Sequence, residues 1–339
     1  MSSTAWMSEV RSGVEARLRA FFDDKRAEAF ALHPRTVELV DSIDALTMRG
    51  GKRLRSLVIT AGFHACGSGG DAAGVVDLGA AIEVLQSFLL IHDDWMDQDD
   101  ERRGGPSVFA ELRDRHGDAH LGASLAVLAG DLAAVYAAEL FESASFPSSH
   151  RSEARSDFLA MQREVFFGQQ LDLLAVPEVE RMYDLKTGSY TVRGPVRLGA
   201  SLAAATPEQR ACLERFAAPL GVAFQLRDEL LDAFGDPAQT GKPQGSDLRA
   251  GKLTVLVVEA RSRGSDEDRA ALAQAFGRAS ADDRAMAAAI GALERSGARA
   301  RVEERLGELL GQAREALSGA PLDHERLDQL VDLLGLRDR

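Results

Sequence analysis

Two acidic clusters interrupt apolar sequence that is typical of helices, and their spacing suits a metal site. The first acidic cluster is DDWMD, Asp93–Asp97, and the second acidic cluster is DELLD, Asp228–Asp232. A spacing of four residues places the outer carboxylates of each cluster on one helix face, where like charges repel. Divalent cations relieve such repulsion, and Mg²⁺ commonly combines one or two carboxylates with phosphate oxygens. The sequence therefore predicts two helices that hold Mg²⁺ against a phosphorylated ligand.

The sequence that precedes each acidic cluster favours a functional site over a solvated helix face. SFLLIH, residues 87–92, runs into the first cluster, and AFQL, residues 223–226, runs into the second. Acidic surface faces are rarely continuations of such apolar stretches, whereas buried functional carboxylates require them. We therefore interpret both clusters as parts of a binding site.

Basic residues concentrate beside glycines or beside the acidic clusters. The cation loop GGKRLR, Gly50–Arg55, combines a flexible glycine pair with three cations before a helix, which favours anion binding. Arg102 and Arg103 follow the first acidic cluster closely, and the arginine fork suits phosphate oxygens. Further lysines stand near turns or helix starts, at Lys186, Lys242 and Lys252.

Composition predicts a soluble globular protein that binds a small anion rather than nucleic acid. The 339 residues are 45% apolar and 27% charged, with a formal net charge of −13. This charge does not exclude an anionic small ligand, because local fields decide binding in a cleft. We expect no transmembrane helix, since Leu121–Leu140 contains Asp131 and Glu139. No signal-peptide pattern is found at Met1–Arg19, which favours the cytoplasm, and the two cysteines are expected to be free thiols.

Helix patterns dominate the chain, and no convincing strand alternation is found. The predicted helical segments are Val75–His92, Gly122–Phe141, Phe158–Leu174, Arg197–Ala205, Gln209–Phe234 and Asp282–Leu317. The simplest interpretation is one all-α domain over residues 1–339, a helical bundle with its site between facing helices. Residues 1 to about 15 are expected to be flexible.

Taken in order along the chain, these fragments resemble the trans-isoprenyl diphosphate synthase (polyprenyl synthetase) family. The cation loop is similar to that family's GGKRxR motif, and Asp93–Asp97 with the following RRG is similar to its first aspartate-rich motif. The remaining matches are Lys186-Thr187, Phe224–Asp236, Gly241–Pro243 and Asp247–Lys252. The resemblance implies a single-domain all-α bundle around a central deep cavity, similar to geranylgeranyl and farnesyl diphosphate synthases.

The resemblance also implies a role for each matching residue. Mg²⁺, about three ions per active site, would be bound by Asp93, Asp94, Asp97, Asp228 and Asp232. The allylic diphosphate would contact Arg102, Lys186, Thr187, Gln225, Lys242 and Lys252. Isopentenyl diphosphate would contact Lys52, Arg55, Gln86 and Arg103. Catalysis is assigned to Asp93, Asp97, Asp228, Lys186 and Arg102.

The implied reaction is a condensation of isopentenyl diphosphate with a dimethylallyl, geranyl or farnesyl diphosphate. Ionisation of the allylic ester is assisted by Mg²⁺ and cations aimed at the departing diphosphate. The second acidic cluster departs from the family pattern, because Glu229 stands where a second aspartate is usual. We expect activity to survive, since the longer carboxylate can act through water.

Product length is predicted from the helix that enters the first acidic cluster. Phe88 and Leu89 lie five and four residues before Asp93, so Phe88 is about 7–8 Å further along the helix axis. A ring at that depth can block a growing chain. The resemblance then implies a geranylgeranyl (C20) product, with farnesyl (C15) as the neighbouring alternative. Ordinary core packing is the competing interpretation of Phe88.

Other functions stay open at this stage. A class I terpene cyclase shares the ionisation chemistry, but it would not need a second diphosphate pocket such as the cation loop and Arg103 suggest. A head-to-head synthase would have DxxxD pairs instead. A non-catalytic partner subunit should have lost one acidic cluster, and this chain retains both. The resemblance suggests a homodimer without membrane insertion.

Overall fold

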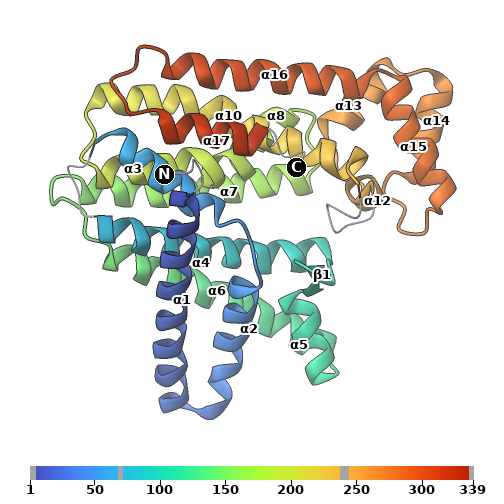
Figure 1. Cartoon of the computed structure of the whole chain (residues 1–339). Coiled ribbons are helices and arrows are strands. Elements are labelled where there is room, and N and C mark those ends of the chain that lie inside the picture. Colours follow the sequence, from blue (N-terminus) through green and yellow to red (C-terminus); the bar gives the residue numbers. More distant parts are fainter. Residues whose placement is uncertain (1–4, 68–71, 237–243, 336–339) are drawn as a thin grey trace. The chain divides into compact units, whose positions relative to one another are not determined.

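The computed structural model describes residues 5–67, 72–236 and 244–335, and this part of the chain is almost entirely helical (Figure 1). Within these ranges the strands are β1 (Glu101–Arg102) and β2 (Gly105–Pro106), which pair as a short antiparallel ribbon. The predicted all-α class is confirmed. The chain divides into two compact units, Met1–Ser152 with Leu198–Ala204, and Glu153–Arg197 with Ala205–Arg339. The prediction of one domain over 1–339 stays a prediction.

Unit 1 carries the cation loop and the first acidic cluster. Helices α1 and α2 run antiparallel to each other (Figure 1), and α4 packs along α6. Small residues permit this close contact, because a Cβ on Gly130 of α6 would lie 2.2 Å from Nε2 of His92. The elements of the unit are α1 (Ala5–Leu32), η1 (Pro34–Thr36), α2 (Val37–Met48), α3 (Leu54–Ala65), α4 (Ala72–Asp97), the ribbon, α5 (Val108–His116) and α6 (Ala119–Ser143).

The first helix is packed along most of its length. It begins at Ala5, and Met7, Val14 and Leu18 are buried. The described part of the N-terminal stretch that we expected to be flexible is therefore helix with a buried apolar face.

Helices α4 and α6 are both long and apolar enough to cross a membrane by length and composition. In unit 1 they pack against each other, and 72% of the apolar window of α4 is buried. Burial of that extent is typical of a core helix, whereas only 39% of the corresponding window of α6 is buried. The outer face of α6 differs, because Leu121, Leu128 and Val135 are exposed at seven-residue intervals.

Unit 2 carries the second acidic cluster near the end of its longest helix, α10. That helix starts with a capping box between Thr206 and Gln209, and Pro207 stands in its first turn. Helix α9 (Gly194–Leu202) starts in unit 2 and ends in unit 1, which includes Leu198–Ala204. The other elements that lie wholly or mainly in unit 2 are α7 (Arg151–Leu173), α8 (Val179–Tyr183), the π-helix η2 (Asp184–Arg193), α10 (Pro207–Phe234), α12 (Ser246–Ala250), α13 (Val255–Arg263), α14 (Asp266–Ala275), α15 (Asp283–Arg295), α16 (Ala298–Leu317) and α17 (Glu325–Gly335).

The predicted helical segments coincide with α4, α6, α7, α9 and α10, although α7 begins at Arg151 rather than Phe158 and α4 ends at Asp97 rather than His92. The prediction of one helix over Asp282–Leu317 is wrong. Two helices occupy this stretch, α15 and α16, and they are separated at Ser296 and Gly297. Gly297 has a φ of +73°, a left-handed conformation that ends a helix. Periodicity continued across this break because both helices are amphipathic.

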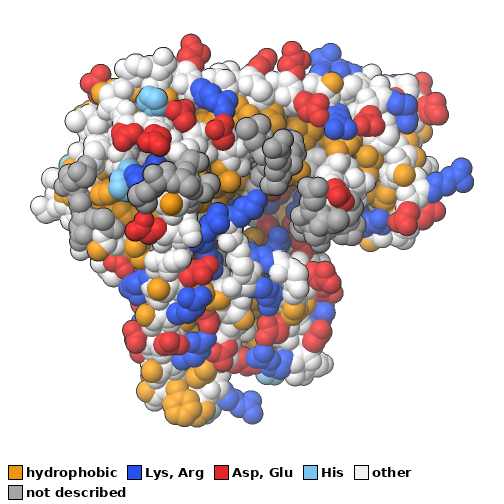
Figure 2. All heavy atoms as spheres, in the orientation of Figure 1, with side chains coloured by type: hydrophobic (Ala, Val, Ile, Leu, Met, Phe, Trp, Pro, Cys, Tyr) orange, Lys and Arg blue, Asp and Glu red, His pale blue; other side chains and the backbone are white. Residues whose placement is uncertain are grey.

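Charges of both signs are spread over the described surface. On the face that Figure 2 shows, acidic and basic side chains are interspersed.

Candidate active site

The first acidic cluster lies at the C-terminal end of α4, and its carboxylates have different environments. Asp93 and Asp97 are half-buried, whereas Asp94 is completely buried. Asp94 accepts hydrogen bonds from Nε of Arg102 at 2.7 Å and from Nη2 of the same guanidinium. Burial raises the pKa of Asp94 to about 6, although the contact with Arg102 opposes this rise. Asp94 therefore holds Arg102, and Asp93 and Asp97 keep their exposure to solvent.

Arg102 and Arg103 are placed by the ribbon that follows the cluster. Nη1 of Arg49, at the end of α2, donates to the carbonyl oxygens of Arg102 at 3.1 Å and Pro106 at 2.6 Å. The guanidinium packs on Gly105, where a Cβ would lie 2.9 Å from Cζ of Arg49. Arg49 was not among the predicted site residues, because a single arginine before the cation loop gives no pattern of its own.

The cation loop joins α2 to α3 and combines one exposed cation with two buried ones. Lys52 is exposed, whereas Arg53 and Arg55 are buried. Nη1 of Arg103 donates to the carbonyl oxygens of Leu46 at 3.3 Å and Gly50 at 3.4 Å. Burial lowers the pKa of Arg103, and repulsion from Arg55 and other nearby arginines adds to this effect. Three of the four residues predicted to bind isopentenyl diphosphate therefore belong to one cationic cluster, on or beside the loop.

The remaining predicted residues of unit 1 lie along α4 before the first acidic cluster. Gln86 is half-buried about two turns before Asp93. Phe88 is 6% exposed, and its ring makes a T-shaped contact with His92, 5.0 Å between centroids. Leu89 is half-buried. A buried ring on α4 is compatible with a block to chain growth and with core packing alike.

The second acidic cluster ends α10 in unit 2, and its members differ as well. Asp228 is exposed and Asp232 is half-buried. The carboxylate of Asp232 accepts hydrogen bonds from Oγ of Ser246 and, at 3.1 Å, from the N–H of Asp247. Asp232 therefore anchors the start of α12, a contact that the sequence pattern did not predict. Its predicted metal ligation stays a prediction.

A cavity of about 70 Å³ in unit 2 brings together most of the residues predicted to bind the allylic diphosphate. Nζ of Lys186 lies 2.6 Å from Oδ2 of Asp172, and Oγ1 of Thr187 donates to Oε1 of Gln225 at 2.7 Å. The lining is formed by Asp172, Met182, Tyr183, Lys186, Thr187, Gln225, Glu229, Asp247, Lys252, Leu253 and Thr254. Asp172 was missed, since a lone carboxylate outside a cluster carries no signal. Asp247 begins the matching motif Asp247–Lys252, but no role was predicted for it.

Close backbone packing positions the π-helix that carries Lys186 and Thr187. A Cβ on Gly168 of α7 would lie 2.2 Å from the nitrogen of Lys186. A Cβ on Gly221 of α10 would lie 2.7 Å from Cα of Gly188. Only glycine permits these approaches, so the cavity wall is fixed by α7 and α10. Lys242, also predicted here, lies outside the described residues.

Glu229 lines the same cavity, although its place in the second acidic cluster predicted a role through water. Its side chain is 2% exposed, and neither carboxylate oxygen has a hydrogen bond among the described residues. Burial raises the pKa of Glu229 well above its usual value, and the nearby carboxylates of Asp247 and Asp232 add to the rise. The glutamate therefore points into the unit while Asp228 points outward.

The carboxylates of the acidic clusters fit a hard cation that also binds substrate. In the described ranges, no three acidic, histidine or cysteine side chains form a ready-made metal site. Mg²⁺ does not need one, because it takes one or two carboxylates and completes its shell with water and phosphate oxygens. Asp93 with Asp97 offers such a pair at one helix end. Because Asp93 and Asp228 belong to different units, a diphosphate bridging them stays a prediction.

The fold and the site together define a class of protein. It is an all-α protein with two acidic helix ends, each accompanied by cations. The sequence profile of the polyprenyl synthetase family matches residues 36–293. The chain is 36% identical over 269 residues to the short chain isoprenyl diphosphate synthase of Methanothermobacter thermautotrophicus, covering 77% of this chain and 78% of that protein. It is 33% identical to the geranylfarnesyl diphosphate synthase of Aeropyrum pernix, covering 85% and 90%.

A solved structure agrees over nearly the whole chain. The geranylgeranyl pyrophosphate synthase of Corynebacterium glutamicum, complexed with isoprenyl diphosphate and magnesium, has a TM-score of 0.91 and 32% identity, covering 97% of this chain and 99% of that one. The chain belongs to the polyprenyl synthetase family and is a trans-prenyltransferase.

Proposed function

We propose that the chain condenses isopentenyl diphosphate with an allylic diphosphate and that its principal product is geranylgeranyl diphosphate (C20). The observation that carries this proposal is the presence of two distinct cationic sites. Lys52, Arg55 and Arg103 cluster in unit 1, and Lys186 and Lys252 line the cavity of unit 2. Two diphosphate substrates require two such sites, whereas a terpene cyclase ionises one substrate.

The reaction needs groups that stabilise a departing diphosphate. The allylic C–O bond breaks with its electron pair remaining on the diphosphate, and the carbon becomes a delocalised cation. The double bond of isopentenyl diphosphate attacks this carbon, a C–C bond forms, and a proton passes to the departing diphosphate. Arg102, Lys186 and Lys252 are assigned to hold that diphosphate, because fixed cations stabilise charge as it develops.

Mg²⁺, about three ions per active site, is proposed to be held by Asp93 and Asp97 of one cluster and Asp228 of the other. When bound, it acts as a Lewis acid on the diphosphate oxygens. Magnesium is present in the Corynebacterium glutamicum structure, and calcium in the related polyprenyl synthase of Caulobacter crescentus. The buried Asp94 orients Arg102 within the same site.

The C20 assignment rests on Phe88. Its buried ring lies on α4 five residues before Asp93, and α4 is lined there by apolar residues that keep water from the cation. Named relatives include geranylgeranyl, geranylfarnesyl and farnesyl diphosphate synthases, so chain length is the property that needs direct measurement.

The test is incubation of the pure chain with Mg²⁺, isopentenyl diphosphate and primers of increasing length. We expect pyrophosphate release that depends on isopentenyl diphosphate, with C20 as the longest major product. A C15 or C25 end point would contradict the assigned length. A cyclic hydrocarbon from one substrate alone, or no turnover with any primer, would contradict the proposed reaction.

We also propose that the chain forms a homodimer in the cytoplasm. The exposed residues Leu121, Leu128 and Val135 form an apolar stripe along α6, with exposed fractions of 40%, 52% and 53%. Contiguous apolar stripes of this kind are typical of protein interfaces. Light scattering coupled to gel filtration gives the mass in solution, and a monomer would refute the dimer. Cell fractionation tests the compartment.

A further inference from the structure

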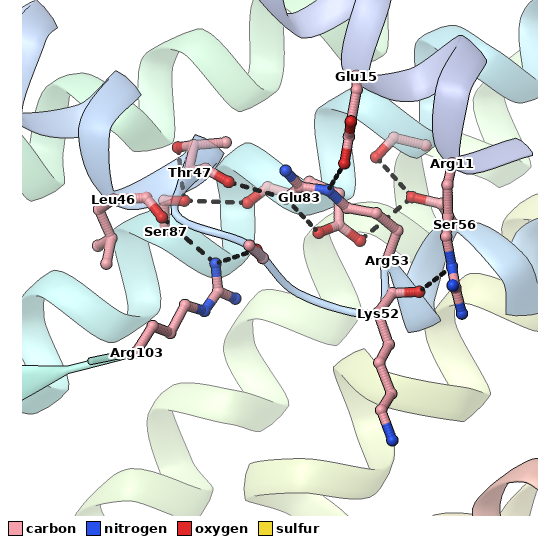
Figure 3. Close-up of polar contacts among 12 residues, drawn as sticks. Arg11, Glu15, Leu46, Thr47, Lys52, Arg53, Ser56, Glu83, Ser87 and Arg103 are labelled. Atoms are coloured by element: carbon pink, nitrogen blue, oxygen red, sulfur yellow. Dashed lines mark hydrogen bonds and ion pairs between the residues drawn. The ribbon is translucent and has the colours of Figure 1, made fainter. Parts of the chain in front are cut away.

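The first helix contacts the cation loop directly. Nε of Arg11 donates to the carbonyl oxygen of Lys52 at 3.0 Å, and Oε1 of Glu15 lies 3.6 Å from Nε of Arg53 (Figure 3). Arg11 and Glu15 are one turn apart on α1, so they reach the loop from the same helix face. Helix α1, Ala5–Leu32, lies outside residues 36–293, over which the family profile matches.

Arg53 is anchored inside unit 1. Its side chain is 2% exposed, and Nη1 donates to the carbonyl oxygen of Thr47 at 2.8 Å and to Oε2 of Glu83 at 3.2 Å. Glu83, on α4, is 3% exposed and also accepts a hydrogen bond from Oγ of Ser56. A buried guanidinium needs such partners, because desolvating an unpaired charge is costly.

The backbone of Arg53 places the neighbouring cations. Its φ of +48° is left-handed, an arrangement that persists only when surrounding contacts hold it. In Figure 3 the side chain of Arg53 points toward Glu83, while that of Lys52 extends away from this pair. Arg103 closes the other side of the loop by donating to the carbonyl oxygen of Gly50. The loop is therefore held from α1, from α4 and from the ribbon.

We infer that Arg11, Glu15 and Arg53 are positioning residues for the isopentenyl diphosphate subsite. They fix the loop backbone so that Lys52, the exposed cation of the loop, is presented to that substrate beside Arg55 and Arg103, and Arg53 does not contact the substrate itself. The inference rests on the proposed function, because it assumes that these cations bind isopentenyl diphosphate. The inference adds helix α1, which lies outside the residues that the family profile matches, to the elements that form the isopentenyl diphosphate subsite.

The test compares KM values for the two substrates in variants of these contacts. Arg11→Ala removes the donor to the loop at a half-buried position, so the fold should be kept. The double variant Arg53→Met with Glu83→Gln removes the anchor without leaving an isolated buried charge. We expect each to raise KM for isopentenyl diphosphate by about 5- to 30-fold. KM for the allylic diphosphate and kcat at saturation should change less than about twofold.

The matched control is Arg17→Ala. Arg17 also lies on α1, and its Nε donates to Asp77 of α4 at 2.7 Å, away from the loop. Its removal should leave both KM values unchanged. An unchanged KM for isopentenyl diphosphate in folded Arg11→Ala, an equal rise in both KM values, or the same rise in Arg17→Ala would overturn the inference. If wild type lacks turnover that depends on isopentenyl diphosphate, the proposed function fails instead, and the two failures are distinguishable.

Discussion

Replacing Phe88 by alanine should lengthen the product by about one isoprene unit. The next layer of α4 below Phe88 is formed by Leu85 and Val84, both 0% exposed, about 4.5–6 Å further along the helix axis. An isoprene unit adds four main-chain bonds, which span about 5 Å. Removing the ring therefore opens room for about one unit before the next layer blocks growth, and the principal product should shift from C20 to C25.

The assay is chromatography of dephosphorylated products at matched enzyme concentrations. Removal of a buried phenylalanine costs about 3–5 kcal/mol of folding free energy, so thermal unfolding must show that the variant is folded at the assay temperature. Phe21→Ala is the matched control. Phe21 is also 6% exposed in unit 1, but it lies on α1 and packs edge-to-face on Phe22 and Tyr136. This control should lose similar stability and keep the wild-type length.

The result that refutes the reasoning is a folded Phe88→Ala variant whose products end at the wild-type length. Phe88 would then be ordinary core packing against His92. A shift in length in Phe21→Ala as well would indicate that general loosening, not the position of the ring, controls growth.

Three further predictions follow from the site and the surface. Asp93→Asn should lower kcat by at least about 100-fold with little change in Tm. Chelation of divalent cations should abolish turnover by the wild type. An Asp93→Asn variant that keeps the wild-type kcat would contradict the metal assignment. Gly221→Ala puts a Cβ 2.7 Å from Cα of Gly188. It should lower the free energy of unfolding in denaturant by about 1–3 kcal/mol and raise KM for the allylic diphosphate. The control Gly311→Ala, whose Cβ would have nothing within 4 Å, should do neither. Leu128→Glu on the exposed stripe of α6 should shift the light-scattering mass to that of a monomer. The control variant is Leu159→Glu, which changes a similarly exposed leucine on α7 of unit 2. An unchanged mass for Leu128→Glu would exclude that stripe from the interface.

Local pattern was enough to predict the helices and the parts of the site that are continuous in sequence. Asp93 and Asp97 share a helix end, and Lys186, Thr187 and Gln225 match motif positions that the cavity of unit 2 brings together. Helical spacing and glycine placement act over a few neighbouring residues, so both can be recognised in a single sequence. The break at Gly297 was missed because two amphipathic helices in succession keep the same period.

Burial and pairing were decided by the tertiary structure. Arg53 and Lys52 are adjacent cations in the loop, yet one is anchored on Glu83 inside the unit and the other is exposed. Asp94 holds Arg102, Asp232 anchors α12, and Arg49 fixes the ribbon. These contacts join residues on separate elements, so their free energies depend on distances and desolvation that no linear spacing specifies. The sequence alone therefore determined which charged groups are available, and folding determined which of them stay exposed and which are buried and hold their neighbours in place.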